Sequence, residues 1–197
     1  MDEENNQKLL IWFSPEKLLQ NYWKGNIKTT ISGDFKELLN YKVLYVGKST
    51  EQNICARLSN HSTFQDILTS EGALSYGNLP SNEIVIMLFR IKDNNSLVKW
   101  GAESKEKDIS DFIHNYSIPD DKTVSLDAEK ALIQHLRPGY NKIMYNSYPN
   151  KSDLINKDPH IVFLYSFTDP ITLIYEDGTI KGDELIERRN FISVKSK

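Results

Sequence analysis

Residues 41–49 read YKVLYVGKS, and no other stretch of the chain indicates its fold as strongly. The β-branched and aromatic residues end at Gly47, which is typical of a strand, so we expect a strand over residues 41–47. A glycine at the end of a strand lets a substrate or another backbone segment approach closely. The stretch therefore predicts that Tyr45 points off a sheet into accessible space.

A helical pattern follows this strand. Residues 51–59 place Ile54 and Leu58 at helical spacing, so we expect a helix there. Arg57 and His61 are four residues apart, and residues at that spacing lie on one face of a helix. We therefore expect the guanidinium of Arg57 and the imidazole of His61 to lie close together, just beyond the strand.

The clearest helix of the sequence is expected over residues 125–136. Ser125 is a capping candidate, and the turn at residues 137–139 (RPG) ends the helix. Glu129 then lies in the first turn, where the helix dipole favours a carboxylate. Asn141 follows the turn. Glu129 and Asn141 are thus the polar residues that this helix and its turn bring to a site.

The remaining expected elements complete the fold class. They are helices over residues 14–23, 34–39, 62–68, 109–116 and the start of 184–194, and strands over residues 9–13, 83–91, 160–167, 171–180 and the end of 184–194. The run over residues 83–91 (EIVIMLFRI) is almost entirely apolar, as in a strand buried on both faces. We expect an α/β (α+β) fold with a small, mostly antiparallel sheet flanked by helices.

Three regions are expected along the chain, although no repeat or linker divides it sharply. Residues 1–40 are expected to form an N-terminal extension, and residues 41–150 a core domain with a polar insertion at residues 93–123. Residues 151–197 are expected to form a strand-rich C-terminal extension.

The ordered set of motifs resembles the GIY-YIG nuclease superfamily. The matching residues are the Tyr45-Val46-Gly47 motif, Arg57, His61, Glu129 in DAEKALI and Asn141 in RPGYN. The resemblance covers residues 41–146. It implies a GIY-YIG-like sheet, a single divalent metal ion bound by a glutamate, and hydrolysis of phosphodiester bonds.

The resemblance and the chemistry of the residues imply the same division of roles. Glu129 would hold one Mg²⁺ or Mn²⁺, since hard cations prefer oxygen ligands. Arg57 would bind a phosphate with its rigid fork of donors, and Tyr45 would orient or deprotonate the attacking water. His61 would move protons or bind a neighbouring phosphate, and Asn141 would fix the geometry. Lys48 and Lys142 flank these motifs and are expected to bind the substrate.

The family places a second tyrosine upstream, and no Gly-Ile-Tyr motif stands there in this chain. Tyr41 is one substitute, because strand residues four apart share a face. The alternative is that residues 9–13 form the first core strand, with a helical insertion before the sheet closes. Both alternatives stay open at this point.

Composition restricts the class of protein. The chain has 197 residues, a net charge of −3, an acidic N-terminus and one cysteine, Cys55. A disulfide within the chain and a cysteine-rich zinc module are excluded, no apolar run is long enough to span a bilayer, and a cytoplasmic protein is expected. The acidic balance argues against indiscriminate DNA binding, but it permits a local basic cleft.

The expected function is metal-dependent endonucleolytic cleavage of DNA, by a restriction-type or mobile-element enzyme. The expected partner is double-stranded DNA, with no membrane, and a homodimer stays open. One alternative is a catalytically degenerate fold that binds DNA or protein. Another is a structure-specific nuclease on branched DNA or RNA. An ATPase is rejected, because residues 47–49 (GKS) lack the upstream glycine of a phosphate-binding loop, position 42 being lysine.

Overall fold

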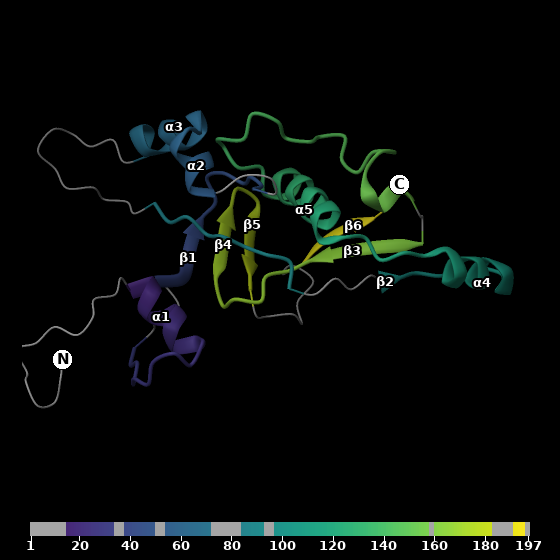
Figure 1. The fold of residues 1–197 in the computed structure, drawn as a ribbon, viewed down its shortest axis with the longest axis horizontal. Helices are drawn as coiled ribbons and strands as arrows, with labels where there is room; N and C mark the ends of the chain where they lie inside the picture. Colours follow the sequence, from purple (N-terminus) through teal and green to yellow (C-terminus); the bar gives the residue numbers. More distant parts are fainter. Residues whose placement is uncertain are drawn as a thin grey trace, which may run out of the picture.

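The structure is a computed structural model that describes residues 15–33, 38–49, 54–71, 84–92, 97–157, 160–182 and 191–195. Its elements, in chain order, are α1 (Pro15–Trp23), β1 (Asn40–Lys42), α2 (Ile54–Ser59), α3 (Ser62–Ser70), β2 (Leu97–Val98), α4 (Glu106–Asn115), α5 (Asp121–Leu136), the 3₁₀ helix η2 (Leu154–Lys157), β3 (Ile161–Tyr165), β4 (Thr172–Tyr175), β5 (Gly178–Lys181) and β6 (Ile192–Lys195). Helices and small sheets combine into a mixed α/β fold, as expected (Figure 1).

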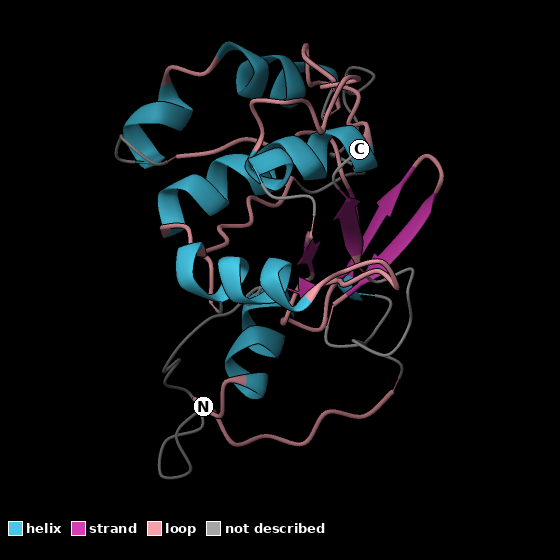
Figure 2. Ribbon diagram, turned by 90° about the vertical axis from the view of Figure 1, so that its right-hand side faces the viewer, coloured by secondary structure: helices cyan, strands magenta, loops and turns pink. Residues whose placement is uncertain are grey.

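The strands form two small sheets. In the first, of order β1-β4-β5, β1 pairs in parallel with β4, and β4 and β5 form an antiparallel hairpin. In the second, of order β2-β3-β6, every pairing is antiparallel. Figure 2 shows most of the helices on one side of these strands. The partner of β1 thus comes from the far C-terminal part of the chain.

The hydrophobic core is built around α5 and the C-terminal strands. Its buried members are Ala131, Leu136, Tyr148, Ile155, Ile161, Phe163, Ile180, Ile192 and Val194. Full burial of one such aliphatic or aromatic side chain contributes about 1.5–3 kcal/mol to folding. Most of these residues follow position 150, so the C-terminal strands share one core with α5, the helix that carries Glu129.

The helix α5 begins earlier than Ser125, the cap expected from the sequence. The N-cap is Asp120, whose carboxylate accepts hydrogen bonds from the backbone N–H of Thr123 at 2.9 Å and from its hydroxyl at 2.7 Å. These bonds favour the ionised form and hold the pKa of Asp120 below its usual value. Arg137 ends the helix in the left-handed conformation, with φ of 47°. The earlier start moves Glu129 well past the first turn.

Two expected strands are wrong. The strand expected over residues 41–47 is only three residues long, because its partner β4 turns back after Tyr175 and the ladder ends at the bond from Val43 N–H to the carbonyl of Ile174. The buried strand expected over residues 83–91 is absent from its described part, residues 84–91, which expose Leu88 by 67% and Phe89 by 52%. Apolar composition alone does not supply a strand with a pairing partner.

Most of the remaining expectations are confirmed. Helices lie close to the expected ranges at α1, α2, α3 and α4, and strands do so at β3, β4, β5 and β6. The strand expected over residues 9–13 and the helix expected to begin residues 184–194 lie outside the described residues, as do residues 34–37 of the helix expected over residues 34–39. In the described part of the chain, no helix is long and apolar enough to cross a membrane.

Candidate active site

The segment that follows β1, residues 43–49, is held in place by residues 140 and 141. The side chain of Asn141 makes two hydrogen bonds to Val46: its Nδ2 donates to the carbonyl at 2.8 Å, and its Oδ1 accepts from the N–H at 2.9 Å. The N–H of Tyr140 also donates to the carbonyl of Leu44 at 3.1 Å. Asn141 is only 8% exposed. Its side-chain amide therefore satisfies the backbone N–H and C=O of Val46, as a neighbouring strand would, in a segment that has no β ladder.

Tyr45 and His61 form the chemical centre of this region. The hydroxyl of Tyr45 lies 3.2 Å from Nε2 of His61, and the two rings meet at an interplanar angle of 60° with centroids 5.2 Å apart. Both residues are half-buried. A phenol within hydrogen-bonding distance of an imidazole is an arrangement suited to proton transfer.

His61 is not on the helix that carries Arg57, so the same-face expectation is wrong. The helix α2 ends at Ser59, where the hydroxyl of Ser59 and the amide of Asn60 both donate to the carbonyl of Ala56. His61 instead has an extended backbone and stands at the N-cap of α3. It faces Tyr45 because the chain turns between two helices, and helical spacing plays no part.

Gly47 is required by the position of the tyrosine ring. A Cβ atom at Gly47 would lie 2.7 Å from Cε1 and 2.8 Å from Oη of Tyr45. Carbon atoms in proteins do not approach this closely, so any larger residue at position 47 would displace the ring. The glycine expected to end a strand thus has a different role: it makes room for the hydroxyl end of Tyr45.

Glu129 contacts the same segment through Lys48. Its Oε2 lies 3.5 Å from Nζ of Lys48, and the two side chains are 12% and 40% exposed, respectively. At this exposure the pair contributes at most about 1 kcal/mol. Glu129 lies more than two turns into α5, and the effect of a helix dipole fades within the first turn. The dipole therefore does not account for this carboxylate.

The other expected site residues are more loosely connected. Arg57 is half-buried on α2, and its guanidinium makes no hydrogen bond or ion pair with another residue in the described ranges. Tyr41 belongs to β1, where it pairs with Leu173. Lys142 is exposed beside Asn141.

The site offers a metal ion one carboxylate. Among the residues that the structure describes, no group of three or more histidine, cysteine or acidic side chains is arranged around a common point. Mg²⁺ often keeps several water ligands and binds through one or two carboxylates. Glu129 at the edge of the site fits this mode, with Lys48 as the cation that now neutralises it.

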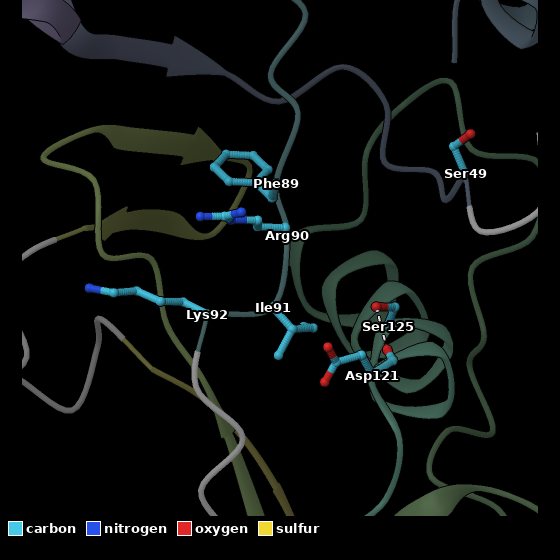
Figure 3. A pocket seen from close by; sticks show the side chains of 7 residues that line it. All are labelled: Ser49, Phe89, Arg90, Ile91, Lys92, Asp121 and Ser125. Atoms are coloured by element: carbon cyan, nitrogen blue, oxygen red, sulfur yellow. Dashed lines mark hydrogen bonds between the residues drawn. The ribbon is translucent and has the colours of Figure 1, made fainter. Parts of the chain in front are cut away.

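The sequence did not predict a depression that lies next to this site. It has a volume of about 540 Å³ and is lined by Ser49, Phe89, Arg90, Ile91, Lys92, Asp121 and Ser125 (Figure 3). The signal in the sequence was the pair of basic residues, Arg90 and Lys92, at the end of an apolar run. Their significance depends on which part of the chain lies opposite them, and the sequence does not indicate that.

A buried polar cluster fastens the other side of α5. The carboxylate of Asp127, 4% exposed, accepts hydrogen bonds from the hydroxyls of Tyr148 at 2.9 Å and Tyr165 at 2.6 Å. Burial, and then the charge of Asp127, raise the pKa of both tyrosines far above the usual value. Lys130 donates to the buried Asp153 at 2.6 Å. The cluster is fully paired and connects α5 to the C-terminal segment, so its role is structural.

A second tyrosine–histidine pair lies at the end of α5. The hydroxyl of Tyr175 is 3.2 Å from Nε2 of His135, with ring centroids 5.3 Å apart. Burial lowers the pKa of His135, and nearby Asp177 opposes this effect. Burial, and then Asp177, raise the pKa of Tyr175. The pair joins the β4–β5 hairpin to the last turn of α5.

Comparison with known proteins adds no relative: no protein-family model, curated protein or solved structure matches this chain.

Proposed function

We propose that the protein is a GIY-YIG-type nuclease that hydrolyses phosphodiester bonds in DNA with one divalent metal ion. The observation that supports this most is a convergence on residues 45–48. His61 contacts Tyr45, Asn141 contacts Val46 and Glu129 contacts Lys48. The segment thus carries a tyrosine and a cation, and a histidine and a carboxylate from other parts of the chain contact it; together they supply groups that phosphodiester hydrolysis uses.

In the proposed reaction the chain's own residues move the protons. Tyr45 gives its hydroxyl proton to Nε2 of a neutral His61, and its oxygen takes a proton from the attacking water. The water oxygen then bonds to phosphorus, and the bond from phosphorus to the leaving sugar oxygen breaks. That oxygen takes a proton from solvent. Arg57, the nearest arginine in the sequence, would bind the equatorial phosphate oxygens.

The metal ion would be held by Glu129. When bound, it stabilises negative charge on the phosphate and lowers the pKa of a coordinated water. Lys48, whose side chain is 40% exposed, would then turn from Glu129 to a phosphate. Asn141 has both amide atoms engaged by Val46, so its role in the proposal is to position residues 45–48 rather than to bind the ion.

Within the superfamily we propose a restriction-type endonuclease on double-stranded DNA. One observation favours a second candidate, a DNA-binding module without activity: Lys48 already neutralises Glu129. In that case Glu129 would be a structural partner of the lysine. The two candidates differ in a simple respect, because a binding module retains DNA without cutting it in Mg²⁺ or Mn²⁺.

The decisive substitution is Glu129→Gln, assayed on plasmid DNA with Mg²⁺ or Mn²⁺. The amide keeps the size of the side chain and removes the charge that a hard cation needs. We expect cleavage to fall to background while DNA binding persists or tightens, because the carboxylate also repels phosphate. Glu176→Gln, at an exposed carboxylate in the β4–β5 turn, serves as the control and should cleave like the wild type. Undiminished cleavage by Glu129→Gln would contradict the proposal.

A further inference from the structure

The depression described above lies between residues 84–92 and the first half of α5. Its floor and walls come from two parts of the chain that are some thirty residues apart in sequence, with Ser49 at one side. Figure 3 shows Asp121 and Ser125 on α5 facing the segment that carries Arg90 and Lys92. Its lining is rich in charged and hydroxyl side chains, so it suits a polar ligand rather than an apolar one.

Two of the residues that line this depression are close in the chain to the candidate active site. Ser49 directly follows Lys48, and Ser125 lies one helical turn before Glu129, about 6 Å along the axis. Both members of the Lys48–Glu129 pair therefore border the depression through their nearest neighbours. A chain-like substrate that passes the candidate site along α5 would enter it.

The charges of the depression are unevenly arranged. Arg90 and Lys92 are both exposed, and Figure 3 shows their side chains extending in the same direction, away from Asp121. Within the described part of the chain, neither has a carboxylate at ion-pair distance. The two cations lie two residues apart in the sequence, and both line the depression. Their donors remain available to an anion, and Arg90 offers the fork that matches a phosphate.

We propose that Arg90 and Lys92 bind the phosphate backbone of the DNA strand next to the cleaved bond. This inference rests on the proposed function, and it adds the path of the substrate: from Lys48 and Glu129 the strand runs past the depression on the side of residues 84–92 to which Arg90 and Lys92 point, away from Asp121. The carboxylate of Asp121 stands at the far side of the depression, where it repels phosphate and limits the contact to the Arg90 side. The contacts are to the backbone, so they are independent of DNA sequence.

The test is the salt dependence of DNA binding. A short fluorescent duplex of mixed sequence is titrated with the full-length protein in EDTA, which prevents metal-dependent cleavage, at several salt concentrations. Each phosphate contact contributes about 0.9 to the slope of log K against log salt. We expect Arg90→Gln and Lys92→Gln each to reduce the slope by about this amount, and the double variant by about twice as much. Asp121→Asn should tighten binding by about twofold to fivefold, because it removes a repulsive charge.

The control is Lys107→Gln, which removes an exposed cation from α4, an element that contributes nothing to the depression. It should leave the slope unchanged. A double variant with the slope and affinity of the wild type would overturn the inference, and so would an equal loss with Lys107→Gln, since that indicates a diffuse charge effect. Circular dichroism checks that each variant is folded. Plasmid cleavage is measured separately: a protein that binds DNA through Arg90 and Lys92 yet never cuts it would retain this site and refute only the nuclease.

Discussion

The two tyrosine–histidine pairs of this protein have nearly the same geometry and different surroundings. Tyr45 and His61 approach to 3.2 Å with ring centroids 5.2 Å apart, and Tyr175 and His135 approach to 3.2 Å with centroids 5.3 Å apart. Both pairs are partly buried. If a tyrosine–histidine contact were sufficient for catalysis, the molecule would have two active sites.

The neighbours of the two pairs separate them. The pair at Tyr45 belongs to a segment that also contacts Glu129 through Lys48, and it lies beside a depression with two exposed cations. The pair at Tyr175 has the carboxylate of Asp177 as its charged neighbour. Under the proposed function, Lys48, Arg90 and Lys92 would attract a phosphate to the first environment, whereas Asp177 would repel it from the second. The comparison teaches that the convergence of charged groups, rather than the pair itself, carries the functional argument.

The experiment that best distinguishes the two pairs is the matched substitution of Tyr45 and Tyr175 by phenylalanine. Tyr45→Phe should reduce cleavage by about 10²–10⁴-fold, the usual contribution of a general acid or base, because it removes only the hydroxyl that handles the proton. Tyr175→Phe removes the same group from the other pair and should change the rate by less than about twofold. Single-turnover cleavage of plasmid DNA measures both. Equal losses in the two variants would mean that the pairs are equivalent and that the site is misassigned.

The sequence predicted local structure well because helices depend on near neighbours. Pro15 opens α1 and Gly25, with φ of 68°, ends its trailing turn; Arg137 and the Pro-Gly pair end α5. The selection of Tyr45, His61, Glu129 and Asn141 as candidate site residues also rested on their order along the chain. The structure brings three of these four to residues 45–48 by contacts that span between 16 and 95 residues.

The sequence failed where the partner of a residue is distant. Nothing in residues 41–47 indicates that β1 pairs with residues 172–174, so the end of the ladder at Lys42 was unpredictable. The apolar run at residues 84–91 has strand composition, yet no strand partner for it lies within the described residues. Asn141 was expected to fix the geometry of the site, but the sequence did not indicate that its partner is the backbone of Val46. Each failure is a long-range pairing, which pattern and propensity do not encode.

A second test substitutes the glycine that lies near each tyrosine ring, Gly47 near Tyr45 and Gly178 near Tyr175. Gly47→Ala places a Cβ within 2.7 Å of the ring of Tyr45, whereas Gly178→Ala meets Oη of Tyr175 at an ordinary 3.6 Å. The first change should push the Tyr45 hydroxyl away from His61 and lower cleavage by about 10-fold to 10²-fold, the effect of a misplacement near 1 Å. The second does not crowd the tyrosine, but φ of 158° at Gly178 strains any L side chain, so it should lower the free energy of unfolding and leave cleavage by the folded protein unchanged. Cleavage rates and urea unfolding are measured together, and a Gly47→Ala variant as active as the wild type would show that the ring position is unimportant.

The smallest expected effect concerns the pair at Tyr175, and it is an effect on stability. Burial lowers the pKa of His135 from 6.5, so the folded state binds a proton less readily than the unfolded state. Below pH 6.5 the unfolded state gains the proton first, and the free energy of unfolding falls as the pH falls, until the pH drops below the folded pKa. His135→Gln should remove this part of the pH dependence. Asp177→Asn should steepen it, because Asp177 holds the pKa of His135 up.

Urea unfolding of the three proteins from neutral to mildly acid pH measures these slopes, and cleavage is assayed in parallel above pH 6.5. Since His135 is only partly buried, solvent screens the effect. We therefore expect its change in the free energy of unfolding to be smaller than the change in activation free energy that Tyr45→Phe causes. If Asp177→Asn flattened the slope, the sign of the Asp177 contribution would be wrong. A large loss of cleavage in His135→Gln would remove the distinction between the two pairs, because a purely structural histidine has no part in the reaction.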